Sequence, residues 1–240
     1  VRSDHRKKAG NEMNGWGEYV AAFGLFLASH AFPVRPPVKP WLVARLGKTG
    51  FTLAYSALSV AILVWLITAA GRAPYVELWP RAEWQNLIAL AALAAACLII
   101  ALAAFRPNPF SFGGWRDENF NASRPGIIGL VRHPYLAAIA LWALGHLAPN
   151  GDLAHVLLFG GFSVLAVAGM RLIDRRRQRE MGPAAWQALR DVSYGARAVE
   201  ISWDLVVRLV AGFGLLILLI LLHPAVIGFE AVDLQYLWRS

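Results

Sequence analysis

Two histidines in apolar segments are the residues of this sequence with the clearest potential for chemistry. His30 lies near the end of the block "GLFLASHAFPVRP", and His146 lies late in "LWALGHLAPNGD". An imidazole in such a segment is costly unless it is paired or bound to something, and imidazole is also a protein ligand of haem iron. From these residues alone two interpretations stay open. The two rings could bind haem b, or each could form a hydrogen bond with a neighbouring helix.

Small residues next to both histidines favour the haem interpretation, because a flat macrocycle must approach the helix backbone closely. The sequence places Ala28, Ser29, Ala143 and Gly145 beside the two rings. A site shared by both rings also requires similar depths in the membrane. Helical rise alone puts them about 9 Å apart in a hydrocarbon core of about 30 Å. A tilted or deeply placed second helix would meet this requirement.

Arg132 and His133 form a second candidate binding site, in "LVRHPYL", directly before an apolar helix. Cationic side chains at a helix N-terminus could bind an anionic group of a cofactor. The alternative is that both residues are interfacial anchors that face lipid phosphate groups.

The elements that carry these residues are long apolar blocks, in a chain that is 58% hydrophobic and only 16% charged. A helix needs about 20 apolar residues to cross a bilayer. We therefore predict an all-α, polytopic membrane helical bundle with about six transmembrane helices. The predicted spans are residues 16–33, 51–70, 86–105, 135–149, 153–171 and 205–227. Residues 1–15 are expected to be a disordered N-terminal extension, and residues 16–240 a single integral membrane domain.

Basic residues lie in the loops between these blocks, and this distribution explains the formal net charge of +8 better than nucleic-acid binding does. The three most basic loops are 34–50, 106–134 and 171–204, which carry four, four and seven Lys or Arg residues. Because basic loops alternate with less basic ones, we predict that these three are cytoplasmic. The partner of this chain is then a lipid bilayer, and we expect a multi-pass membrane protein.

Other reactive residue types are assigned structural roles. The single cysteine, Cys97, lies inside a predicted span and excludes both a disulfide and a thiolate zinc cluster within one chain. Asp152 is expected to cap the span that follows it, and Asp204 to pair with Arg208 four residues later.

The basic segment "RLIDRRRQREMGPAAWQALRDVS" has Trp186 and Leu189 on one amphipathic face. One interpretation is a helix that lies on the anionic inner leaflet. The other is a lid over a site in the membrane.

Several stretches of this sequence resemble the NnrU family of bacterial integral membrane proteins. They are "SHAFPVRP", "RLGKTGFTLAYSALSVAILVWLI", "RHPYLAAIALWALGHLAPNGD" and "DRRRQREMGPAAWQAL", and the resemblance extends from about residue 20 to 195. It implies a location in the bacterial inner membrane and a link to nitrite and nitric oxide reductase function in denitrification, with denitrification membrane proteins as partners.

The NnrU family is similar in turn to zeta-carotene isomerase, a membrane enzyme that uses haem b to isomerise a cis double bond. This resemblance implies that His30 and His146 are the haem ligands, and that the substrate is a hydrophobic small molecule. The isomerase has a cysteine three residues before its second ligand, and here that position is Ala143. Haem binding is compatible with this difference, whereas isomerase chemistry loses its thiolate alternative.

A second resemblance is to isoprenylcysteine carboxyl methyltransferases and related phospholipid methyltransferases, which bind S-adenosylmethionine. Arg132, His133 and Pro134 match their Arg-His-Pro motif, but the later acidic pair does not match, since Asp174 is followed by Arg175. Methyl transfer is therefore one alternative function. A non-catalytic role as a membrane assembly or transport factor is another.

Overall fold

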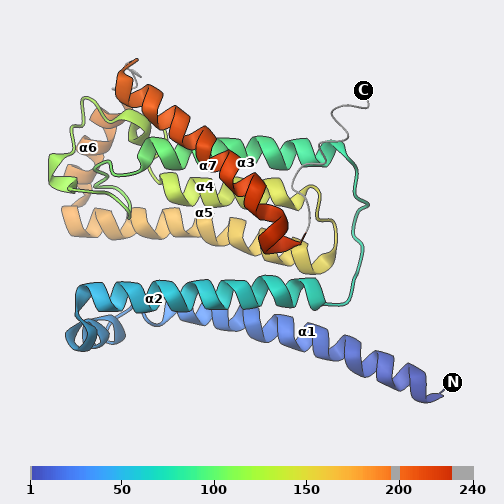
Figure 1. Cartoon of the computed structure of the whole chain (residues 1–240). Helices are drawn as coiled ribbons and strands as arrows, with labels where there is room; N and C mark the ends of the chain where they lie inside the picture. The colour runs from blue at the N-terminus through green and yellow to red at the C-terminus, as the bar shows by residue number, and fades with distance from the viewer. Residues whose placement is uncertain (1, 196–200, 229–240) are drawn as a thin grey trace. The chain divides into compact units, whose positions relative to one another are not determined.

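The computed structural model describes residues 2–195 and 201–228, which form α-helices joined by loops and two short 3-10 turns (Figure 1). The elements are α1 (Arg2–Ala31), α2 (Val38–Arg72), α3 (Trp84–Ala103), η1 (Asp117–Asn119), η2 (Gly126–Gly129), α4 (Pro134–Leu147), α5 (Leu153–Met181), α6 (Pro183–Gly195) and α7 (Trp203–Ile227). No strand occurs among these residues beyond an isolated bridge. The predicted all-α class is confirmed.

The helices agree closely with the predicted spans. Within the described residues, α2, α3, α5 and α7 are long and apolar enough to cross a membrane, and α4 is a shorter apolar helix. α4 begins with Pro134 in its first turn, where the missing N–H costs nothing. α1 contains the first predicted span up to Ala31 and extends back to Arg2, so its backbone includes residues that we assigned to an N-terminal extension. The chain is therefore a multi-pass membrane protein.

The chain divides into two compact units, and the first contains α1, α2, the segment up to Trp79 and residues 152–158. α1 packs against α2 in this unit. Glu18 of α1 accepts a hydrogen bond of 3.0 Å from Trp65 Nε1 and forms an ion pair with Arg72. These contacts join the end of α2 to α1.

Two segments predicted to lie on the outer side meet in the first unit. The Leu153 N–H donates a 2.8 Å hydrogen bond to the Val76 carbonyl, and Glu77 forms an isolated bridge with Asp152. Asp152 Oδ1 accepts a 3.2 Å hydrogen bond from the His155 N–H. The predicted capping role of Asp152 at the start of α5 is thereby confirmed.

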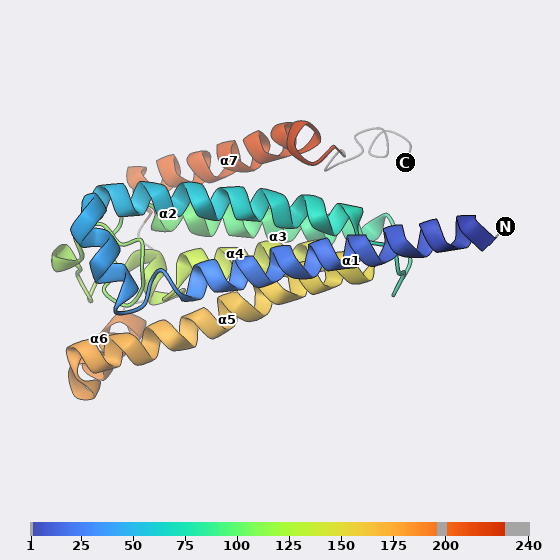
Figure 2. The ribbon, with the colours of Figure 1, turned by 90° about the horizontal axis from the view of Figure 1, so that it is seen from below.

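The second unit contains α3, α4, most of α5, α6 and α7. α3 packs against both α4 and α7, and the two views of the ribbon agree on this arrangement (Figures 1 and 2). Small residues permit the close approach. A Cβ atom on Gly145 of α4 would lie 2.5 Å from Ala92 Cβ, and one on Gly212 of α7 would lie 2.9 Å from Leu98 Cδ2.

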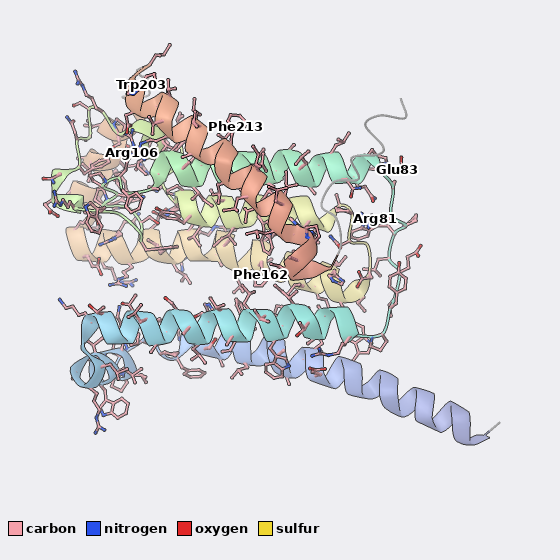
Figure 3. The ribbon with its side chains drawn as sticks, viewed as in Figure 1. Arg81, Glu83, Arg106, Phe162, Trp203 and Phe213 are labelled. Carbon is pink, nitrogen blue, oxygen red and sulfur yellow. The ribbon has the colours of Figure 1, made fainter. Side chains whose placement is uncertain are left out.

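Arg208 joins the start of α7 to the end of α3. It forms the predicted ion pair with Asp204, with Nε 2.9 Å from the carboxylate, and Nη1 donates to the carbonyls of Ala101 and Ala104. These carbonyls belong to the last turn of α3 and to the residue that follows it, where backbone acceptors lack helical partners. Asp204 also pairs with Arg106, which lies at the same end of the second unit as Trp203 (Figure 3).

In the basic segment after residue 171, the predicted amphipathic face packs on the protein; one of its two interpretations had placed this face on the inner leaflet. α5 continues to Met181, Gly182 adopts a positive φ of 84°, and α6 begins at Pro183. Trp186 of α6 is 4% exposed and packs edge-on against Phe110, with ring centroids 6.3 Å apart. The apolar face of α6 therefore covers the segment between α3 and α4, because Phe110 offers an aromatic surface there. The sequence pattern alone did not reveal this surface.

Candidate functional site

A buried ionic network lies at the end of the second unit where α5 leaves its apolar part. Arg132 precedes α4, and its guanidinium donates to both carboxylate oxygens of Asp174 on α5, at 3.0 Å from Nε and 2.6 Å from Nη2. The two side chains are only 19% and 18% exposed. Such a two-point contact fixes the orientation of both groups.

His133 extends this network to a serine. Its Nε2 lies 3.0 Å from Asp174 Oδ1, and its Nδ1 lies 3.0 Å from Ser111 Oγ. A carboxylate can only accept, so Nε2 carries the hydrogen. In the neutral ring Nδ1 is then the acceptor, and the Ser111 hydroxyl donates to it.

Further contacts connect the network to two other segments, α6 and the loop after α3. Arg132 Nη1 donates to the Tyr194 hydroxyl of α6 at 3.0 Å, and its guanidinium carbon lies 5.4 Å from the centre of the Trp186 ring. Asn108 Nδ2 donates to the Arg132 carbonyl at 3.1 Å. Two loops that we predicted to be cytoplasmic, 106–134 and 171–204, are therefore in contact, as a common side of the membrane requires.

Ser111, His133 and Asp174 have the hydrogen-bond order of a nucleophilic triad. Ser111 is only 2% exposed, however, and His133 only 4%, so neither reaches a substrate in this conformation. Asp174 is already neutralised by Arg132. The arrangement therefore acts as a structural link and not as an accessible nucleophile.

The same contacts bear on the predicted binding role of Arg132 and His133. The structure brings these two residues together, but Asp174 occupies them both. An anionic group of S-adenosylmethionine would have to displace this carboxylate. Neither side chain faces outward as a lipid anchor would, because His133 is buried and Arg132 is largely so.

His30 is an exposed residue in the last turn of α1. Its Nδ1 lies 2.8 Å from the Phe26 carbonyl oxygen, four residues earlier, and the ring lies 4.2 Å from the Phe26 ring, centre to centre. Since a carbonyl only accepts, Nδ1 carries the hydrogen and Nε2 keeps its lone pair. We find no hydrogen-bond partner for Nε2 within residues 15–195 and 201–226.

His146 repeats this geometry on α4 of the second unit. Its Nδ1 lies 2.8 Å from the Trp142 carbonyl oxygen, again four residues earlier. The ring is half-buried, with Trp142 and Phe159 each 5.1 Å away, centre to centre. Nε2 again keeps a lone pair and has no hydrogen-bond partner among the side chains that the structure describes.

The small residues beside these rings do not line a slot for a flat macrocycle. Ala143 is fully buried, and Gly145 faces Ala92 and Ala89 of α3. Ser29 is buried and donates to the Phe26 carbonyl at 2.9 Å. The small side chains before His146 instead let α4 approach α3 closely.

The sequence profile of the family described as "NnrU protein" matches residues 18–231, which is most of the chain. The chain belongs to the NnrU family. No curated protein and no solved structure matches it.

In this NnrU-family chain, sequence reasoning missed Ser111, Asp174 and Tyr194 as members of the network. Asp174 was noticed only because it breaks the acidic pair of the methyltransferases. One signal could have identified its role, since it is the only acidic residue between Arg171 and Arg179. An acidic side chain in such a basic stretch indicates a specific cationic partner.

The buried His133 predicts a loss of stability in acid. Burial lowers the pKa of His133, and the nearby Arg132 acts in the same direction, although Asp174 opposes them. The unfolded chain therefore takes up this proton at a higher pH than the folded chain, and stability falls as the pH drops below about 6.5. For one group the slope is at most about 1.4 kcal/mol per pH unit.

Unfolding of the detergent-solubilised protein between neutral and mildly acidic pH measures this slope. The variant His133→Gln keeps a polar group at the site without titrating and should show a flatter profile. An identical slope in wild type and variant would assign the acid sensitivity to other groups.

Proposed function

We propose that this chain binds haem b, with His30 and His146 as iron ligands. The observation that supports this most strongly is that both imidazole rings form the same hydrogen bond. In each, Nδ1–H is committed to the carbonyl four residues earlier, which leaves Nε2 as a free lone-pair donor. In metal sites, the imidazole nitrogen that does not bind the metal usually donates such a hydrogen bond, which fixes the orientation of the ring.

Aromatic side chains lie beside both rings and offer surfaces for stacking with a macrocycle, although the small residues there form no slot for it. Phe26 and Tyr55 lie beside His30 in the first unit, at ring distances of 4.2 and 6.0 Å. Trp142 and Phe159 lie beside His146 in the second. Aromatic walls exclude water from a porphyrin and stabilise its apolar surface. A b-type haem held in this way would supply redox or ligand-binding chemistry at the iron.

The visible spectrum of the purified full-length protein, oxidised and then reduced with dithionite, tests this proposal. We expect a Soret band and sharp reduced α and β bands, lost in both His30→Ala and His146→Ala. The variant His155→Ala is the matched control, because this histidine pairs with Asp152 and should not affect the spectrum. A colourless wild type that also fails to take up added hemin would refute haem binding.

From the family resemblance we also propose a role in nitrogen-oxide respiration in the bacterial inner membrane. Deletion of the gene in the source bacterium should then slow nitric oxide reduction during anaerobic growth. A haem-dependent isomerisation of a hydrophobic polyene is the competing role. Unchanged nitric oxide reduction together with accumulation of a cis isomer would favour it.

A further inference from the structure

An open cavity of about 380 Å³ lies at the corner where α5 ends and α6 begins, and Arg175, Gln178, Arg179 and Pro183 line it. Both arginines are exposed. They are four residues apart on one helix and thus project from the same face. The donors of this cavity are two guanidinium groups and one side-chain amide, a combination suited to phosphate oxygens.

The carboxylates of this region are already paired with other arginines. Asp174 binds Arg132, Glu180 binds Arg176 and Arg177, and Asp191 binds Arg190. Within the described part of the chain, neither Arg175 nor Arg179 has a hydrogen-bond or ion-pair partner. The cavity therefore holds positive charge that the protein itself does not neutralise.

The position of the cavity along α5 indicates where its ligand lies. α5 has 29 residues and spans about 43 Å, whereas the hydrocarbon core is about 30 Å thick. Measured from Leu153, the last two turns extend beyond the core into the layer of lipid headgroups. The arginines belong to these turns, on the side that the basic loops mark as cytoplasmic.

The start of α6 adds to the positive potential. The Trp186 N–H bonds the Gly182 carbonyl, whereas no backbone acceptor pairs with the N–H groups of Ala184 and Ala185 in the described residues. Such unpaired N–H groups at the N-terminus of a helix attract an anion. Pro183, the first residue of this helix, forms part of the cavity wall.

We propose that this cavity binds the phosphate group of an anionic phospholipid from the inner leaflet, with Arg175 and Arg179 as the main contacts. The proposal is independent of haem binding. A bound lipid would hold the α5–α6 corner at the membrane surface through its headgroup, while Trp186 faces the protein.

Native mass spectrometry of the detergent-solubilised full chain, titrated with phosphatidylglycerol or phosphatidylcholine, tests the site. We expect selective binding of phosphatidylglycerol and a loss of affinity of about thirtyfold in Arg175→Gln/Arg179→Gln. The matched control is Arg176→Gln, on the same helix but paired with Glu180, which should bind like wild type. The double variant Arg175→Lys/Arg179→Lys keeps the charge and should retain most of the affinity.

Three results would overturn the proposal. The first is equal affinity for the two lipids, and the second is equal affinity in the double glutamine variant and in wild type. The third is displacement of the lipid by millimolar inorganic phosphate, which would make this a site for free phosphate. Circular dichroism of each variant verifies that it is folded. If the glutamine double variant does not fold, the test rests on the lysine double variant, which must retain most of the affinity for phosphatidylglycerol.

Discussion

Asp174→Asn is expected to lower the free energy of unfolding by about 3 kcal/mol. The carboxylate is the shared partner of Arg132 and His133, and it is largely buried with them. An asparagine has the same size but no charge, so the Arg132 guanidinium would remain in the protein without its counter-ion. Removal of one partner of such a pair is costly because the other charge stays desolvated.

Reversible unfolding in mixed micelles at neutral pH measures this effect, with Asp191→Asn as the control. Asp191 is exposed, and in the described part of the chain it pairs with its neighbour Arg190, so its substitution should change stability by less than about 0.5 kcal/mol. Equal effects of the two substitutions would mean that the network is hydrated and contributes little to the fold.

Gly145→Leu is expected to destabilise the second unit by about 2–3 kcal/mol. A Cβ atom at this position would lie 2.5 Å from Ala92 Cβ and 3.3 Å from Ala89 Cα, so α3 and α4 would have to separate. A shift of α4 would also move His146, the next residue. We therefore expect a lower haem content in this variant as well.

The control for this substitution is Gly214→Leu on α7, where a Cβ atom would meet no other atom within 4 Å. A leucine there should be accommodated, with unfolding and expression close to wild type. Equal stability of Gly145→Leu and Gly214→Leu would contradict the close packing of α4 against α3 at Gly145.

The spans were predictable because a helix that crosses the bilayer needs a long apolar run, and in this sequence prolines mark where several of these runs end. α1 ends at Ala31, just before Pro33, and α4 starts at Pro134 as expected. The ion pair of Arg208 with Asp204 was also predictable, since its spacing is a local helical property. Local geometry and hydropathy together therefore gave most of the fold.

The network was not predictable, because its members are far apart in the sequence. Nothing near Ser111 or Tyr194 indicates that both approach the segment before α4. The same limit applies to Trp186, whose partner Phe110 lies in a loop without periodicity. The role of Gly145 was misjudged for a related reason, since a small residue beside a histidine serves a cofactor or a neighbouring helix equally well.

The sequence separation within the network has a consequence for the synthesis of the protein. Arg132 precedes Asp174 by 42 residues and Tyr194 by 62. At about 5–20 residues per second, the last of these partners leaves the ribosome roughly 3–12 s after the arginine. Until Asp174 emerges the segment before α4 has an unpaired cation, and until α6 emerges it has an unprotected aromatic surface at Phe110. The nascent chain is therefore most vulnerable to proteolysis and aggregation just before α6 emerges.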